Sequence, residues 1–203
     1  MFFKQVKHRG DNFSYIIADD STKEAAIVDP SFNADAIVQV VRGQGLHAEY
    51  IINTHSHADH TAGNEDLKQR FHAKIVAYKE SSLKKDVSVE DGDIIRVGSV
   101  SIRVIHTPGH TSDGVCLLVD GKLLTGDTLF VGECGRTDLP DGSPADMYHS
   151  LFDKLMKLDD DVEVYPGHDY GSSPKSTIGK EKRTNYVLVE RPLKEFVEFM
   201  RTP

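Results

Sequence analysis

The sequence predicts an α/β fold, organised as one domain over residues 1–203, a length sufficient for one sizeable core. Short apolar runs typical of buried strands alternate with helical patterns. Two strand pairs are joined by two-residue hairpin turns, Gly98-Ser99 and Asp120-Gly121. Histidine and aspartate follow several of the apolar runs, and α/β proteins tend to place their ligand sites at the carboxyl ends of strands.

The first half of the chain alternates strands with helices. Strands are predicted over residues 2–7, 14–18, 24–28, 50–53 and 73–78. A first helix has the apolar face Ala36, Ile37, Val40 and Val41. A second helix is predicted over residues 62–71, and the polar residues 79–90 are expected to form a loop.

Two hairpins and two helices make up most of the second half. The hairpin strands are predicted over residues 94–97, 100–105, 115–119 and 122–124, and a last strand over 162–165. The first of these helices has the core face Met147, Leu151, Leu155 and Leu158, and a C-terminal helix contains Leu193, Phe196, Val197 and Met200. The Gly-rich residues 132–143 are expected to be irregular and to border a substrate site. The cation-rich residues 175–183 are expected to form a solvated loop.

The stretch Thr54-His55-Ser56-His57-Ala58-Asp59-His60 holds four potential metal ligands directly after the strand 50–53. In an extended loop His55 and His57 point the same way, because side chains repeat every two residues. Asp59 and His60 then lie where the chain turns into the next helix, and they can face a second point nearby. One short segment can therefore serve two adjacent metal positions.

Matching ligands occur later, each after an apolar run and a tight turn. The seven candidate metal ligands are His55, His57, Asp59, His60, His110, Asp127 and His168. Imidazole and carboxylate suit zinc and iron equally, so the ligand types do not choose the metal.

Composition excludes several classes of function. The formal charge of -8 argues against a surface that follows nucleic-acid phosphates, and no apolar run is long enough to span a membrane. The N-terminal residues lack the layout of a secretory signal, so a cytoplasmic protein is expected. The two cysteines, Cys116 and Cys134, are too few for a disulfide framework and form no CxxC metal site.

The motifs THSHADH, GHT at 109–111, GDT at 126–128 and PGHDY at 166–170 resemble the metallo-β-lactamase superfamily, over residues 13–185. The resemblance implies an αββα sandwich, in which helices flank two mixed sheets and the metal cleft lies at one edge. In dinuclear zinc members of that superfamily, the counterparts of His55, His57 and His110 hold one metal. Those of Asp59, His60 and His168 hold the second, and that of Asp127 bridges them.

A narrower resemblance rests on residues 90–93 (EDGD), 134–138 (CGRTD) and 176–182 (STIGKEK), which are similar to persulfide dioxygenases. That family keeps the fold but binds one Fe(II), at positions matching His55, His110 and Asp127. The implied reaction converts glutathione persulfide, O2 and water to sulfite and glutathione. The partners are then a small-molecule thiol persulfide and O2, and the resemblance suggests a homodimer.

Further residues are candidates for roles beside the metal. Asp59 and Tyr170 are candidate catalytic residues, and Arg136 and Tyr170 are candidate substrate contacts. The planar fork of Arg136 suits a glutathione carboxylate, although a salt bridge with Asp138 would also account for it. Tyr170 could instead be ordinary packing. Cys134 is either a small buried hydrophobe or a thiol that traps persulfide.

The alternative is a glyoxalase II type hydrolase that cleaves S-lactoylglutathione or a related thioester at two Zn(II) ions. Its common form has a C-terminal helical domain, whereas this chain ends about 35 residues past His168. A scaffold without activity would be expected to have lost ligands, and a nuclease would need an inserted domain. Of the other histidines, His8, His47, His72 and His149 are expected at surface or edge positions, and His106 in a packed structural role.

Overall fold

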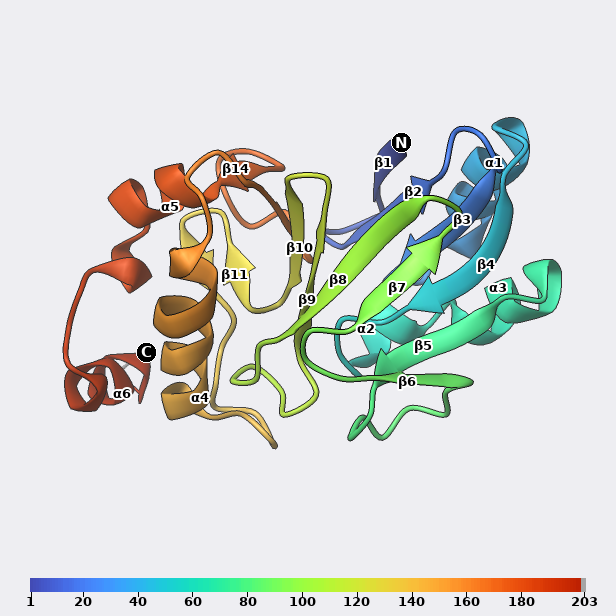
Figure 1. The fold of residues 1–203 in the computed structure, drawn as a ribbon. Helices are drawn as coiled ribbons and strands as arrows, with labels where there is room; N and C mark the ends of the chain where they lie inside the picture. Colours follow the sequence, from blue (N-terminus) through green and yellow to red (C-terminus); the bar gives the residue numbers. More distant parts are fainter. Residues whose placement is uncertain (202–203) are drawn as a thin grey trace.

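The computed structural model describes residues 1–201 as two six-stranded sheets packed face to face, with helices on their outer sides (Figure 1). The first sheet has the order β1-β2-β3-β4-β5-β6, and the second has the order β14-β13-β10-β9-β8-β7. This arrangement confirms the predicted fold class. Within residues 1–201 no helix combines the length and the apolar character needed to cross a bilayer.

The first sheet comes entirely from the first half of the chain. Its strands are β1 (Phe2–Lys7), β2 (Phe13–Ala18), β3 (Glu24–Val28), β4 (His47–Ile52), β5 (Lys74–Tyr78) and β6 (Val87–Val89). The β1, β2 and β3 strands pair antiparallel, and β3 to β6 pair parallel. Helical segments make the crossovers from β3 to β4 and from β4 to β5, and a loop makes the one from β5 to β6. Those helices are α1 (Ala34–Gly43), α2 (Ala58–Thr61) and α3 (Asn64–Phe71).

The second sheet comes from the second half of the chain. Its strands are β7 (Ile94–Val97), β8 (Val100–His106), β9 (Val115–Val119), β10 (Lys122–Gly126), β13 (Glu163–Pro166) and β14 (Ser176–Thr177). A short hairpin, β11 (Leu129–Phe130) and β12 (Glu133–Cys134), follows β10. The helices are α4 (Pro144–Tyr148), continued by π and 3-10 turns to Lys157, then α5 (Ile178–Thr184), a 3-10 turn (Tyr186–Leu188) and α6 (Leu193–Arg201).

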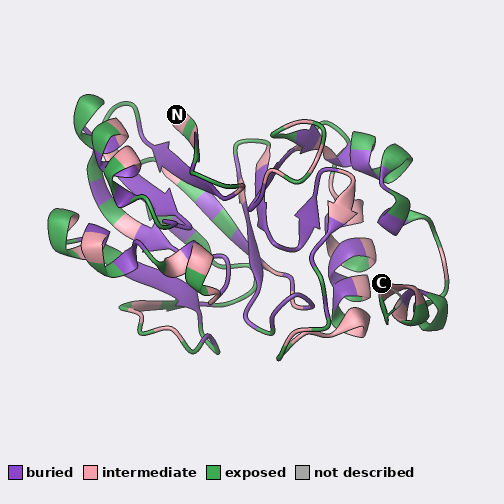
Figure 2. Ribbon diagram, turned by 180° about the vertical axis from the view of Figure 1, so that it is seen from behind, coloured by how far each residue is buried: buried purple, intermediate pink, exposed green. Residues whose placement is uncertain are grey.

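The core has three layers because side chains alternate across each strand. On β2, Tyr15 and Ile17 pack between the two sheets, whereas Ile16 packs under the outer helices against Ile37 of α1. A third apolar cluster joins the outer face of the second sheet to α4, α5 and α6. Figure 2 shows buried strands flanked by helices whose outer sides are exposed. Burying each large apolar side chain contributes about 1.5–3 kcal/mol, so this layering sets the frame on which the site is built.

Three local predictions were wrong. Residues 79–90 include the edge strand β6, whose three residues are too few for a period of two to be recognised. The stretch 175–183 forms β14 and α5, and it buries Glu181 completely. His8 is buried rather than at the surface, and its Nε2 lies 2.6 Å from Ser14 Oγ. Burial lowers the pKa of His8.

Candidate metal centre

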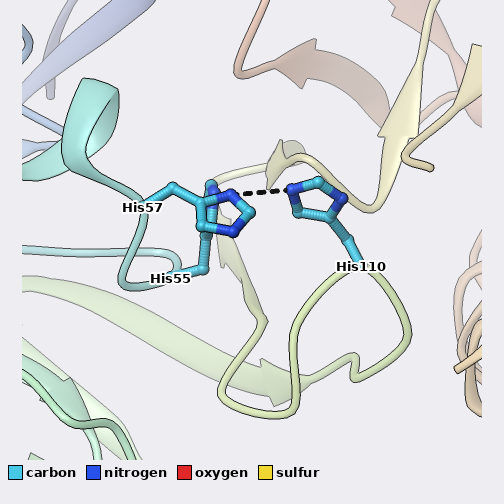
Figure 3. Close-up of side chains that lie close together, drawn as sticks. All are labelled: His55, His57 and His110. Carbon is cyan, nitrogen blue, oxygen red and sulfur yellow. Dashed lines mark hydrogen bonds between the residues drawn. The ribbon is translucent and has the colours of Figure 1, made fainter. Parts of the chain in front are cut away.

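The structure brings all seven predicted ligands together where β4, β8, β10 and β13 end. His55, His57, Asp59 and His60 lie on the loop after β4 and on α2, His110 follows β8, Asp127 follows β10, and His168 follows β13. Figure 3 shows His55 and His57 from one loop turned toward His110 from another. The helix predicted from residue 62 begins earlier, at Ala58, so that Asp59 and His60 lie on a helical turn.

His55, His57 and His110 form the first set of donors. His57 Nδ1 lies 3.0 Å from His110 Nε2, and the His55 ring lies 4.7 Å and 5.2 Å from the other two ring centres. Two ligands of one ion at bonds of about 2.1 Å are roughly 3.0–3.4 Å apart, depending on octahedral or tetrahedral geometry. The spacing of His57 and His110 therefore suits two ligands of a single ion.

Asp59, His60 and His168 form the second set. His60 Nε2 lies 3.1 Å from His168 Nε2, and Asp59 Oδ2 lies 3.3 Å from His60 Nε2 and 3.4 Å from His168 Nε2. These three separations match the roughly 3.3 Å between donors around a tetrahedral zinc ion. All three donors of the second set therefore lie at separations that suit a single ion.

Asp127 lies between the two sets. Its carboxylate oxygens are 3.3 Å from His60 Nε2, 3.2 Å from His168 Nε2, 3.5 Å from His110 Nε2 and 4.0 Å from His55 Nε2. Burial opposes the charge on Asp127, but the neighbouring histidines outweigh it and hold its pKa well below the usual range. An ionised carboxylate in this position can serve either metal position or bridge both.

The ring nitrogens that face away from the donors are held by other groups. His110 Nδ1 lies 2.8 Å from the Arg136 carbonyl, which accepts its hydrogen bond. The corresponding Nδ1 atoms of His55, His60 and His168 lie 3.1 Å from Thr54 Oγ1, 3.2 Å from Asp29 Oδ2 and 3.4 Å from Asp11 Oδ1. Such outer contacts fix the orientation and tautomer of metal-binding histidines.

Two buried atoms support a metal at this site. His55 Nε2 and Asp127 Oδ1 are both buried, and neither makes a hydrogen bond within residues 1–201. Buried polar atoms nearly always have a partner, and an ion bound between these atoms would provide one. Two glycines allow the backbone to pass close to Asp127. A Cβ at Gly135 would lie 1.8 Å from the Asp127 carbonyl oxygen, and one at Gly167 would lie 2.4 Å from Asp127 Oδ1.

The other predicted site residues lie around the metal centre. Tyr170 is 55% exposed and stacks on His168, with ring centres 4.7 Å apart and planes 3° apart. The Arg136 side chain is exposed and makes two 2.7 Å hydrogen bonds to Asp138, so the salt bridge considered from sequence is present. Cys134 is buried, and burial raises the pKa of its thiol to about 12, which disfavours a reactive thiolate.

Several residues that support the site were missed from sequence. Asn12 Nδ2 donates a 2.9 Å hydrogen bond to Asp59 Oδ2, and Asp11 lies beside His168. Asp29 has a positive φ of 49° and accepts hydrogen bonds from the backbone and side chain of Thr54 as well as facing His60. The one available signal was the position of Asp29 at the end of a strand, before a proline.

The chain is similar to several known proteins. The family profile "Metallo-beta-lactamase superfamily" matches residues 9–84 and 78–168. A probable polyketide biosynthesis zinc-dependent hydrolase, BaeB, from Bacillus velezensis is 34% identical over 93% of this chain and 86% of its own length. The mitochondrial persulfide dioxygenase ETHE1 of Homo sapiens is 34% identical over 93% of this chain and 75% of its own. The hydroxyacylglutathione hydrolase of Pelagibacter ubique is 34% identical over 79% and 67%.

Among solved structures, that of ETHE1 from Myxococcus xanthus superposes on this chain with a TM-score of 0.95. It shares 34% sequence identity, and the match covers 100% of this chain and 91% of that one. The likeness therefore extends past the last predicted ligand, His168, through the C-terminal helix α6.

Proposed function

The chain belongs to the metallo-β-lactamase superfamily, and from that membership we propose that it is a persulfide dioxygenase, which oxidises the persulfide of a glutathione-type thiol with O2 and water to sulfite and the free thiol. The proposed cofactor is one Fe(II) held by His55, His110 and Asp127. Two imidazoles and one carboxylate form the ligand set of many non-haem iron oxygenases and leave positions open.

The observation that carries this proposal is the likeness over the full chain to ETHE1 of Myxococcus xanthus. The curated relatives do not rank the two reactions, because the probable zinc-dependent hydrolase BaeB and human ETHE1 each match 93% of this chain at 34% identity. Asp127 Oδ2 lies 3.5 Å from His110 Nε2 and 4.0 Å from His55 Nε2, longer than the roughly 3.0–3.4 Å between two ligands of one ion, so this ligand set requires the three side chains to move closer together when Fe(II) binds.

When bound, Fe(II) would supply the positions at which O2 and the persulfide sulfur meet. We assign the binding of the thiol carrier to Arg136 and Tyr170. Arg136 can exchange its partner Asp138 for a substrate carboxylate at little cost, since exposed ion pairs contribute little to stability. Asp59 is proposed to accept a proton from the water consumed in the reaction. The Asp59 side chain is 36% exposed, so its carboxylate is accessible to that water.

The second candidate is a hydrolase of the hydroxyacylglutathione type with two Zn(II) ions. The completeness of the second set favours it, because the 3.1–3.4 Å separations of Asp59, His60 and His168 suit tetrahedral zinc. Two adjacent ions would polarise a thioester carbonyl and activate a water.

Oxygen uptake distinguishes the two candidates. Fe(II)-loaded and Zn(II)-loaded protein are each given glutathione persulfide in an oxygen electrode, and sulfite is quantified. The proposal expects rapid uptake and stoichiometric sulfite with iron only. Absence of uptake by fully iron-loaded protein, together with hydrolysis of S-lactoylglutathione by zinc-loaded protein, would replace the dioxygenase with the hydrolase.

A further inference from the structure

Glu181 is a fully buried carboxylate on α5, outside the metal centre. It belongs to the stretch 176–182, whose likeness to persulfide dioxygenases the metal ligands do not explain. A buried charge is costly unless hydrogen bonds surround it. Its neighbours therefore indicate what it holds in place.

Every hydrogen-bond partner of Glu181 is a donor. Its Oε2 accepts from the Gly132 backbone N–H at 2.8 Å and from Asn185 Nδ2 at 2.9 Å, and its other oxygen accepts from the Ser176 hydroxyl. Asn185 Nδ2 also donates to the Glu133 carbonyl at 3.1 Å. Glu181 and Asn185 therefore fasten both the turn and the second strand of the β11–β12 hairpin.

That hairpin contacts the metal centre from one side. It follows Asp127 directly, and in Figure 1 it lies between β10 and the helices of the last third of the chain. Phe130 on β11 lies edge-to-face against His168, with ring centres 5.9 Å apart. Beyond β12, the Arg136 carbonyl accepts the hydrogen bond from His110 Nδ1. A shift of the hairpin would therefore displace contacts to two imidazoles in different donor sets.

We propose that Glu181 is a positioning residue of the metal centre, which fixes the β11–β12 hairpin at Gly132 and Glu133 so that Arg136 and Phe130 hold His110 and His168 in place. The inference rests on the proposed ligand roles of His110 and His168. It requires no particular reaction, because metal affinity reports the orientation of the ligands directly.

The test measures Co(II) affinity and the visible spectrum of the Co(II)-loaded full chain, with thermal unfolding alongside. Glu181→Ala is expected to weaken Co(II) binding by about tenfold, the low end of the range for residues that orient metal ligands, and to change the spectrum. Glu181→Gln is the conservative variant. Its amide oxygen can accept from Gly132 and Asn185 while its NH2 donates to Ser176, so affinity and spectrum should be restored.

Thr177→Ala is the matched structural control. Thr177 Oγ1 accepts from Lys180 N and caps α5, so this variant lowers the melting temperature without touching the hairpin. Its Co(II) affinity should remain within twofold of the wild type. If Glu181→Ala does not fold, Asn185→Ala removes the donor to Glu133 and should weaken Co(II) binding in the same way.

The outcomes separate this inference from the ligand assignment. Wild-type affinity in Glu181→Ala, or an equal loss in Thr177→Ala, overturns the positioning role of Glu181. Failure of Glu181→Gln to restore the affinity overturns the hydrogen-bonding account. If His110→Ala binds Co(II) as tightly as the wild type, the proposed ligand set itself fails, irrespective of Glu181.

Discussion

Replacing His60 with alanine separates the two metal positions, because His60 belongs to the second set of donors and not to the first. Its Nε2 lies 3.3 Å from both Asp59 Oδ2 and Asp127 Oδ1 and 3.1 Å from His168 Nε2. In the first set His60 is a neighbour of His55, with ring centres 4.3 Å apart, but it takes no part in the contact between His57 and His110. The variant therefore removes a donor from one metal position and only a neighbour from the other.

The expected loss of rate in His60→Ala differs between the two candidate reactions. In a dinuclear hydrolase the second position would fall from four donors to three. Weaker binding of the second ion would remove one preorganised positive charge, which costs about 10²–10³ in kcat, or roughly 3–4 kcal/mol. In a mononuclear iron enzyme His60 only supports Asp127. His60 makes no hydrogen bond to Asp127 Oδ1, so the variant loses only a charged neighbour at 3.3 Å, and we expect a cost of about 1.4 kcal/mol, which is tenfold in rate.

The assay compares two activities in one variant. Fe(II)-loaded His60→Ala is tested for oxygen uptake with glutathione persulfide, and the Zn(II)-loaded variant for hydrolysis of S-lactoylglutathione. The matched control is His149→Ala, because His149 is an exposed histidine on the π turn that continues α4. The dioxygenase proposal expects oxygen uptake to fall by no more than about tenfold. A loss of oxygen uptake of 10³ or more in folded, iron-loaded protein would refute the separation of the two positions.

Three further predictions concern single residues. Arg136→Ala should raise the KM for glutathione persulfide about tenfold with little change in kcat or melting temperature, because an exposed ion pair contributes little stability; Arg103→Ala on the exposed side of β8 is the control. Cys134→Ala should keep kcat/KM within twofold in steady-state assays, since burial raises its thiol pKa to about 12. In metal-free protein, burial opposes the charge on His168, but Asp127 outweighs it and the pKa rises to about 9. The contribution of His168 to the free energy of unfolding is fully present below about pH 6.5 and is lost as the pH rises toward 9. The free energy of unfolding measured in urea should therefore fall across that pH window in the wild type, and the fall due to His168 should be absent in His168→Gln.

The sequence predicted the ligand cluster because its signal is local. His55 and His57 are two residues apart on an extended loop, and their rings do lie on one side, 4.7 Å apart. The later ligands His110, Asp127 and His168 each follow a strand, so the sheet order alone brings them together. Strand patterns and hairpin turns predicted the α/β class, whereas the sandwich of two mixed sheets was implied by the resemblance to the metallo-β-lactamase superfamily.

The residues that support those ligands were not predictable in the same way. Asn12 meets Asp59 across 47 positions, and Asp29 meets His60 across 31. Glu181 reaches Gly132 across 49 positions. None of these contacts leaves a periodicity or a spacing in the sequence. Glu181 was further disguised, because its neighbours on α5 are exposed cations and the stretch has the composition of a solvated loop.

All seven predicted metal ligands are present in this chain, so their presence alone does not distinguish the two candidate reactions. A difference in reaction must then come from the groups that hold each donor set in place and from the groups that contact the substrate. In this chain those groups lie on the turn that carries Asn12, which touches only the second set, and on the β11–β12 hairpin and the Arg136 segment after it. Arg136 offers its carbonyl to His110, and its guanidinium is exposed, so the proposed substrate contact and a contact to a predicted metal ligand belong to a single residue. A substitution that moves this segment should therefore change KM and metal affinity together, whereas one that only removes the guanidinium should change KM alone.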